Sequence, residues 1–132
     1  MNRHALGVLE YDKVVAMLVE RTSFQPGSER AARLAPTVDI GSIESALALV
    51  SELRRLLDDG ERLPLEGARD VRAALRRSAT PGASLSCQEL SDVRHTLEAA
   101  ARARSFLKAR RESHPELWEL CEALDPCADV AC

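Results

Sequence analysis

The sequence predicts an all-α fold of about six helices, an antiparallel helical bundle with two long helices. Two observations support this prediction. Nearly every segment repeats its apolar residues with the 3.6-residue period of a helix, and none shows the two-residue alternation of a strand. Short stretches that contain proline and glycine separate these segments. With 132 residues, of which 45% are apolar, the chain is long enough for a single helical domain over residues 1–132.

The first predicted helix carries an apolar stripe and ends near Thr22. The stripe consists of Leu6, Leu9, Val14, Met17 and Leu18. A second, short helix opens near Pro26, because a proline fits the first helical turn, where its missing N–H costs little. This helix should end by Ala35, since the following proline disfavours helical geometry in the residue before it. The residues it should bury are Ala31 and Leu34.

A third helix, the first of the two long ones, is predicted from a cap at Asp39 or Ser42 to Asp58. Its apolar residues recur at intervals of four, three, three and four. They are Ile43, Leu47, Val50, Leu53 and Leu57. Gly60 follows the last turn and is suited to the left-handed position that ends many helices.

A short fourth helix is predicted over residues 68–79, with Val71 and Leu75 facing inward. The stretch before it, LPLEG at residues 63–67, is followed by several arginines and could be a nucleic-acid hook. We interpret it as a corner of the scaffold, in which Gly67 frees the backbone and Asp70 favours the positive end of the new helix. The arginines expected on the solvent side are Arg69, Arg72 and Arg76.

Ser86 and Glu89 form a capping box, which predicts the start of a fifth helix of about 27 residues. Its inward face should consist of Leu90, Val93, Leu97, Ala100 or Ala101, Arg104 and Leu107. A last helix is predicted from Pro115 to a point before Pro126. It carries Leu117, Leu120, Cys121 and Leu124.

None of the common catalytic or nucleotide-binding motifs is present. The sequence has no GxxxxGK[ST], GxGxxG, HExxH or GxSxG pattern and no EF-hand loop. The acidic pairs are interpreted as solvated partners of Arg and Lys, and His95 as a surface or boundary residue. Trp118 is expected to cover a neighbouring helix more readily than to stack on a base. We therefore predict no catalytic, cofactor-binding or metal-binding residue in this chain.

The four cysteines are expected to be free thiols, because they form no CxxC pair and no histidine lies at a zinc-site interval from them. They are Cys87, Cys121, Cys127 and Cys132. No apolar run approaches the roughly 20 residues that span a bilayer, and the N-terminus lacks a signal-peptide pattern. We expect a cytoplasmic protein with no membrane partner. The ending ADVAC, without a cap or polar tail, predicts a piece of a longer protein.

Charge is distributed unevenly along the chain. The net charge is −3, yet the stretch from Arg94 to His114 holds six basic residues against two acidic ones. Such a stretch could contact nucleic-acid phosphates, or it could be a solubilising helix face. The candidate nucleic-acid contacts are Arg102, Arg104, Lys108, Arg110 and Arg111. We expect weak, salt-sensitive binding at most, because no aromatic side chains that could stack on bases are interleaved with these charges.

Two blocks of the sequence resemble the second bacterial MutS family, whose members are MutS-like ATPases without the mismatch-sensing N-terminal domain. Residues 9–47 resemble the opening of that family through LEYDKV, Gly27, Leu34, Pro36, Asp39 and Ile43. Residues 63–100 are similar to its Pro-Leu-x-Gly-x-x-Asp-[Ile/Val] segment, followed by Leu-Ser-x-x-Glu-Leu and a long helix. The same framework is similar to the start of the core, or lever, domain of mismatch-repair MutS proteins. The residues after Pro126 do not align with the family pattern.

The resemblance implies the N-terminal helical core of a homodimeric ATPase that uses ATP and Mg²⁺. The family acts on branched or mismatched DNA in recombination suppression and DNA repair, often carries a C-terminal Smr endonuclease domain, and is implicated at collided ribosomes. No family catalytic residue maps onto these 132 residues, so the expected role is to couple an ATPase domain elsewhere to a DNA clamp. The alternative is a stand-alone helical protein-interaction module with no nucleic-acid role.

Overall fold

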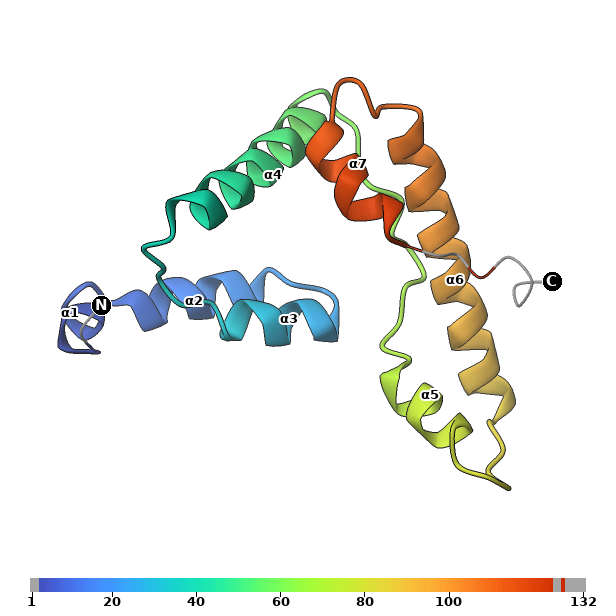
Figure 1. Cartoon of the computed structure of the whole chain (residues 1–132). Helices are drawn as coiled ribbons and strands as arrows, with labels where there is room; N and C mark the ends of the chain where they lie inside the picture. Colours follow the sequence, from blue (N-terminus) through green and yellow to red (C-terminus); the bar gives the residue numbers. More distant parts are fainter. Residues whose placement is uncertain (1–2, 125–126, 128–132) are drawn as a thin grey trace. The chain divides into compact units, whose positions relative to one another are not determined.

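The computed structural model of the chain describes residues 3–124 and residue 127, with side chains from residue 6 onward (Figure 1). Within these residues it contains seven α-helices and no strand, so the predicted all-α class is confirmed. The internal contacts divide the chain into two compact units, one up to Ile43 and one from Glu44 onward.

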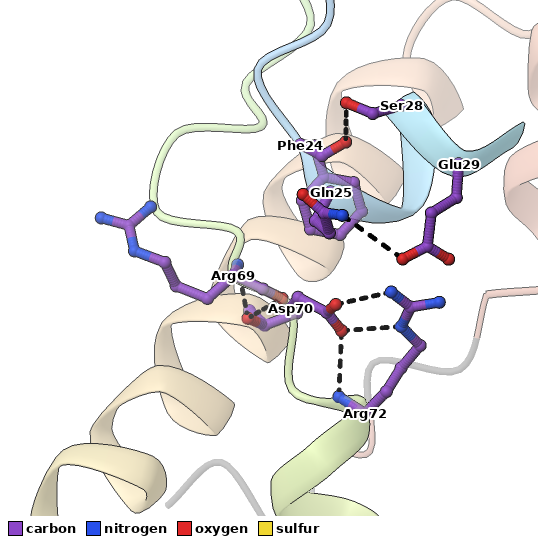
Figure 2. A network of polar contacts seen from close by, with 8 residues as sticks. Phe24, Gln25, Ser28, Glu29, Arg69, Asp70 and Arg72 are labelled. Atoms are coloured by element: carbon purple, nitrogen blue, oxygen red, sulfur yellow. Dashed lines mark hydrogen bonds and ion pairs between the residues drawn. The ribbon is translucent and has the colours of Figure 1, made fainter. Parts of the chain in front are cut away.

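The first unit contains helices α1 (Arg3–Val8), α2 (Tyr11–Glu20) and α3 (Gln25–Ala32). The single first helix predicted from the sequence is broken, because Glu10 adopts a left-handed conformation with φ of 53°. In α3, Gln25 donates to the Glu29 carboxylate one turn later, at 3.5 Å (Figure 2). Ala31 is buried as predicted, whereas Leu34 is 50% exposed, contrary to the prediction.

The apolar stripe of α2 is not covered. The helix has no buried residue, and Val14, Met17 and Leu18 are all exposed. Only α1 and α3 pack against it within the unit, and both are short. The period of the stripe correctly predicted helical structure here, but an apolar stripe alone does not show that its residues are buried.

The second unit begins within the long helix α4 (Ile40–Asp58), whose predicted C-terminal end is confirmed. Gly60 has φ of +78°, and its N–H donates to the Leu57 carbonyl at 3.0 Å. The Glu61 N–H donates to the Leu56 carbonyl, also at 3.0 Å. These two bonds form a Schellman motif, which satisfies carbonyls that the end of the helix would otherwise leave without a donor.

The buried face of α4 differs from the predicted one. Glu52 and Leu56 are buried, and Leu49 and Leu53 pack partly against the same core. Of the five residues in the predicted apolar repeat, four are exposed: Ile43, Leu47, Val50 and Leu57. The packed face of α4 is offset from its most apolar stripe. The contacts with two later helices of the unit determine which face is buried, and that face includes a charged residue, Glu52.

Residues 61–71 form a connection without helix or strand, here called the strap, which contains a turn at residues 66–67 and runs beside α6 (Cys87–Lys108; Figure 1). Three contacts hold it to α6 and the turn that follows. The Arg110 Nε lies 2.5 Å from the Glu61 carboxylate. The Arg102 guanidinium donates to the Glu66 carbonyl at 2.5 Å, and the Arg69 N–H donates to Thr96 Oγ1 at 3.0 Å. The order of these contacts shows that the strap runs antiparallel to α6.

The strap replaces the first third of the predicted fourth helix, so α5 covers only Arg72–Ser78. Asp70 holds the start of α5 by accepting from the Arg72 N–H at 3.2 Å and from its guanidinium at 2.8 and 2.6 Å (Figure 2). The hydrogen bond from Arg72 lowers the pKa of Asp70 to about 2. In α5 the buried residue is Ala74, whereas Leu75, predicted to face inward, is 52% exposed.

Helix α6 starts at the predicted capping box. The Ser86 hydroxyl accepts from the Glu89 N–H at 3.2 Å, and the Glu89 carboxylate accepts from the Ser86 N–H at 2.8 Å. Glu89 also pairs with Arg77 of α5 at 2.6 Å. The helix has 22 residues and ends at Lys108, earlier than predicted, because hydrogen-bonded turns lead from Leu107 to His114.

The last helix, α7 (Pro115–Glu122), lies beside the C-terminal part of α6 (Figure 1). The core of the unit is formed by Leu56, Leu107, Leu117 and Cys121. Trp118 packs partly against it, as predicted. Leu120 and Leu124 are exposed, so only half of the predicted apolar face of α7 is buried.

A buried carboxylate joins α4 to α7. Glu52 is 3% exposed, and its two oxygens accept the backbone N–H groups of Glu116 at 3.2 Å and Leu117 at 2.9 Å. These groups belong to the first turn of α7, where N–H groups have no partner within the helix. Glu52 therefore caps a helix that lies more than 60 residues away in the sequence.

Candidate nucleic-acid interface

The five predicted nucleic-acid contacts lie on α6 and in the turn that follows it. Successive residues of an α-helix are about 100° apart, so Arg102 lies about 200° around the helix from Arg104. Arg104 and Lys108 are four residues apart and share one face. The structure therefore does not bring all five residues to one surface.

Arg102 and Arg110 are engaged within the fold. Arg102 donates to the strap, as described above. The Arg110 guanidinium pairs with Glu61, donates to the Phe106 carbonyl at 3.1 Å and lies 3.8 Å from the centre of the Phe106 ring. Hydrogen bonding from Arg110 lowers the pKa of the Glu61 carboxyl, with a further contribution from the Arg110 charge. Both arginines have structural partners that compete with a ligand.

Arg104, Lys108 and Arg111 line two open depressions that adjoin along one side of α6. The larger, of about 620 Å³, is lined by residues 105 and 108–113. The smaller, of about 240 Å³, is lined by Ala101, Arg104, Ser105 and Lys108. Because Ser105 and Lys108 line both, the two form one continuous surface, here called the basic groove.

The chemistry of the basic groove is suited to an anion. Lys108 and Arg111 are exposed, and neither forms an ion pair within the described part of the chain. Arg104 is half-buried, and its Nε is a buried donor without a hydrogen-bond partner among the described residues. The Arg104 guanidinium also offsets part of the rise in the pKa of Cys121 that burial causes. Arg104, Lys108 and Arg111 could each contact a phosphate oxygen. The engaged Arg110 and one carboxylate, that of Glu112, also line the basic groove.

A purely structural role for Lys108 also fits its position. Lys108 stands in the last turn of α6, where a positive charge interacts favourably with the negative end of the helix dipole. That role explains Lys108 in the last turn of α6. It does not explain Arg104 one turn earlier, or the basic groove that both residues line. The role of these side chains in binding nucleic acid stays a prediction.

The sequence interpretation missed two hydroxyl groups of the basic groove, those of Ser105 and Ser113. Helical spacing could have indicated Ser105, because residues 101, 104, 105 and 108 fall on one face of a helix. Ser113 could not be found in this way, since it lies in the turn beyond α6, which was predicted as helix. Its hydroxyl also lies 2.9 Å from Nδ1 of the buried His114.

The remaining candidate residues do not assemble into a reactive site in the structure. His95 is half-buried beside Gly67 of the strap. Cys87 is exposed and Cys121 is buried, and both are free thiols, whereas Cys127 is exposed. Among the described residues, no group of three or more His, Cys, Asp or Glu side chains could hold a metal ion. No helix in this part of the chain is long and apolar enough to cross a membrane.

Comparison with known proteins finds relatives among the MutS2 endonucleases. The chain is 36% identical over 124 residues to Endonuclease MutS2 of Symbiobacterium thermophilum, which covers 94% of this chain and 15% of the relative. It is 37% identical over 123 residues to Endonuclease MutS2 of an Anaeromyxobacter species, with 93% and 15% covered. For Endonuclease MutS2 of Exiguobacterium sibiricum, the identity is 32% over 117 residues, with 89% and 15% covered.

The resemblance to the second bacterial MutS family is thereby confirmed, and the alternative of a stand-alone interaction module is not favoured. The chain spans about 15% of the length of these relatives. No protein-family model matches the chain. No solved structure matches it either.

Proposed function

The chain is related to the MutS2 proteins along about nine tenths of its length, and we propose from this relationship that it is a helical segment of a DNA-acting protein. In this proposal the segment binds nucleic-acid phosphates through the basic groove. It supplies binding and a rigid scaffold, whereas the endonuclease activity named in the relatives belongs to residues outside this segment. A homodimeric ATPase acting on branched or mismatched DNA is the proposed context.

The basic groove carries the proposal. Arg104, Lys108 and Arg111 gather on a concave surface of a chain whose net charge is −3, so the positive charge is local. The groove contains no aromatic side chain, and its cations and hydroxyls suit phosphate oxygens better than base edges. The expected binding is therefore insensitive to base sequence and strongly dependent on salt.

The test is binding of fluorescein-labelled duplex and four-way-junction DNA to the chain, followed by anisotropy over a range of salt concentrations. The test variant is Lys108→Glu with Arg111→Glu, since both side chains are exposed. Each phosphate contact contributes about 0.9 to the slope of log K against log salt concentration, so loss of two contacts should lower the slope by about 2.

The matched control is Arg54→Glu with Arg62→Glu. Both residues are exposed and lie outside the basic groove, and the change in net charge is the same. The control should keep most of the wild-type affinity and its salt slope. Equal losses in the two variants would show that only net charge matters, and an unchanged slope in the test variant would refute contact through Lys108 and Arg111.

A further inference from the structure

A second surface of the unit that starts at Glu44 has a different character. Residues of helices α4 and α7 line an open groove of about 410 Å³, among them leucine and alanine side chains and two carboxylates. It is lined by Ser45, Leu49, Glu116, Glu119, Leu120 and Ala123. We propose that this groove, here called the acidic groove, binds an amphipathic helix of a protein partner that presents apolar side chains flanked by Lys or Arg.

The spacing of the lining residues forms one continuous stripe on each helix. On α7, Glu116 and Leu120 are four residues apart, and Glu119 and Ala123 are likewise four apart, so these side chains share a face. On α4, Ser45 and Leu49 are also one turn apart. A groove between two helices is suited to the side-chain ridge of a third helix. The described residues include no strand whose edge could pair with an extended peptide.

Charge determines the kind of helix. Neither Glu116 nor Glu119 forms a side-chain ion pair within residues 3–124, although both line the same groove as the apolar side chains. Leu120 is 64% exposed, which is a large exposure for a leucine next to a packed core. A partner with apolar residues would cover Leu120, and its flanking Lys or Arg would meet the two carboxylates. A partner with flanking acids would meet like charges.

The walls of the acidic groove are fixed before a partner binds. Glu52 of α4 accepts two N–H groups from the first turn of α7, and Leu56 contributes to the same core as Leu117 and Cys121. A preformed groove loses little conformational entropy on binding, which favours affinity. The acidic groove and the basic groove share no lining residue, so this inference does not depend on the nucleic-acid proposal.

The test uses two peptides of about 18 residues, five helical turns each, patterned as amphipathic helices. One contains Leu and Lys, and the other contains Leu and Glu in the same positions. Binding of each fluorescein-labelled peptide to the chain is measured by anisotropy. The Leu/Lys peptide should bind and the Leu/Glu peptide should bind at least about tenfold more weakly, since like-charge juxtaposition costs more than 1.4 kcal/mol.

The test variant is Glu119→Lys with Leu120→Ala, and the matched control is Glu98→Lys with Leu90→Ala on α6. All four side chains are at least partly exposed, and each variant makes the same two kinds of change. Loss of Leu/Lys binding in the test variant alone supports the acidic groove as the site. A third variant, Glu119→Lys alone, should reduce the preference for Leu/Lys over Leu/Glu.

Three results would overturn the proposal. They are equal affinity of wild-type protein for both peptides, equal losses in the test and control variants, and an unchanged preference in the Glu119→Lys variant. Circular dichroism of each variant verifies that the helices are retained. A basic groove that binds DNA normally in the same variants separates this test from the test of the proposed function.

Discussion

Replacement of Glu52 by alanine should destabilise the second unit more than any other single change at a charged residue. The Glu52 carboxylate is buried and accepts two N–H groups of α7. The buried Leu117 N–H would lose its only acceptor, at a cost of about 1–3 kcal/mol. The Glu116 N–H lies in a partly exposed position, where loss of a cap costs about 1 kcal/mol.

Removal of the buried carboxylate also relieves its own desolvation, which offsets part of this loss. We therefore expect a net decrease of about 2–3 kcal/mol in the free energy of unfolding. With a urea dependence of about 1–3 kcal/mol per molar, the midpoint should fall by roughly 1–2 M. The Glu52→Gln variant retains one carbonyl acceptor and should show about half of the shift.

The assay is urea unfolding followed by the fluorescence of Trp118, the only tryptophan of the chain, which packs beside the α4–α7 core. The matched control is Glu119→Ala, an exposed glutamate on α7, the helix that Glu52 caps, without a hydrogen bond or ion pair in the described structure. Its midpoint should remain close to that of the wild type. A Glu52→Ala midpoint within about 0.3 M of the wild type would refute the capping role, since the free-energy change would then be below about 1 kcal/mol.

Three further predictions concern local backbone and charge. Gly67→Ala should lower the free energy of unfolding by about 1–2 kcal/mol, because Gly67 has φ of +90°. The control Gly27→Ala should not lower it, because Gly27 is helical and no heavy atom lies within 4 Å of the new Cβ. The midpoints of urea unfolding of the two variants test this difference. Ser86→Ala should cost about 1 kcal/mol and speed amide hydrogen exchange in the first turn of α6. Asp70 has a folded-state pKa of about 2, below its usual 3.8, so its ionised form stabilises the fold above about pH 4 and this contribution disappears as the pH falls towards 2. The difference in thermal midpoint between wild type and Asp70→Asn should therefore be constant from pH 7 to about 5 and shrink below pH 4, and a difference that stays constant down to pH 2 would contradict the assignment.

Local signals in the sequence predicted the ends of helices well. The capping box at Ser86 and the glycine that follows α4 are both present in the structure. Each depends on residues within one or two turns of each other, so the chain needs no distant partner to form it. The proline at the start of α7 was also predicted correctly, although the cap of that helix comes from Glu52, a distant residue that local signals could not indicate.

The buried face of α4, the strap and the engaged arginines depend on tertiary contacts, which local sequence patterns do not predict. The buried face of α4 includes Glu52, which a hydrophobicity pattern assigns to solvent, because its partners are backbone groups of a helix that begins at residue 115. The strap was predicted in part as helix, yet its side-chain and backbone anchors on α6 favour an extended chain. For the candidate site, composition indicated the basic stretch, but only the fold shows that Arg102 and Arg110 are engaged within the molecule.

The strap also constrains how the length of this connection can change. Its anchors at residues 61, 66 and 69 meet α6 and its following turn at residues 110, 102 and 96. An extended chain advances about 3.3 Å per residue and a helix about 1.5 Å, so each strap residue matches roughly two helical residues. Insertion or deletion of one strap residue would displace an anchor by about two helical positions. Unlike most irregular connections, this one should tolerate substitutions at its exposed positions better than any change in its length.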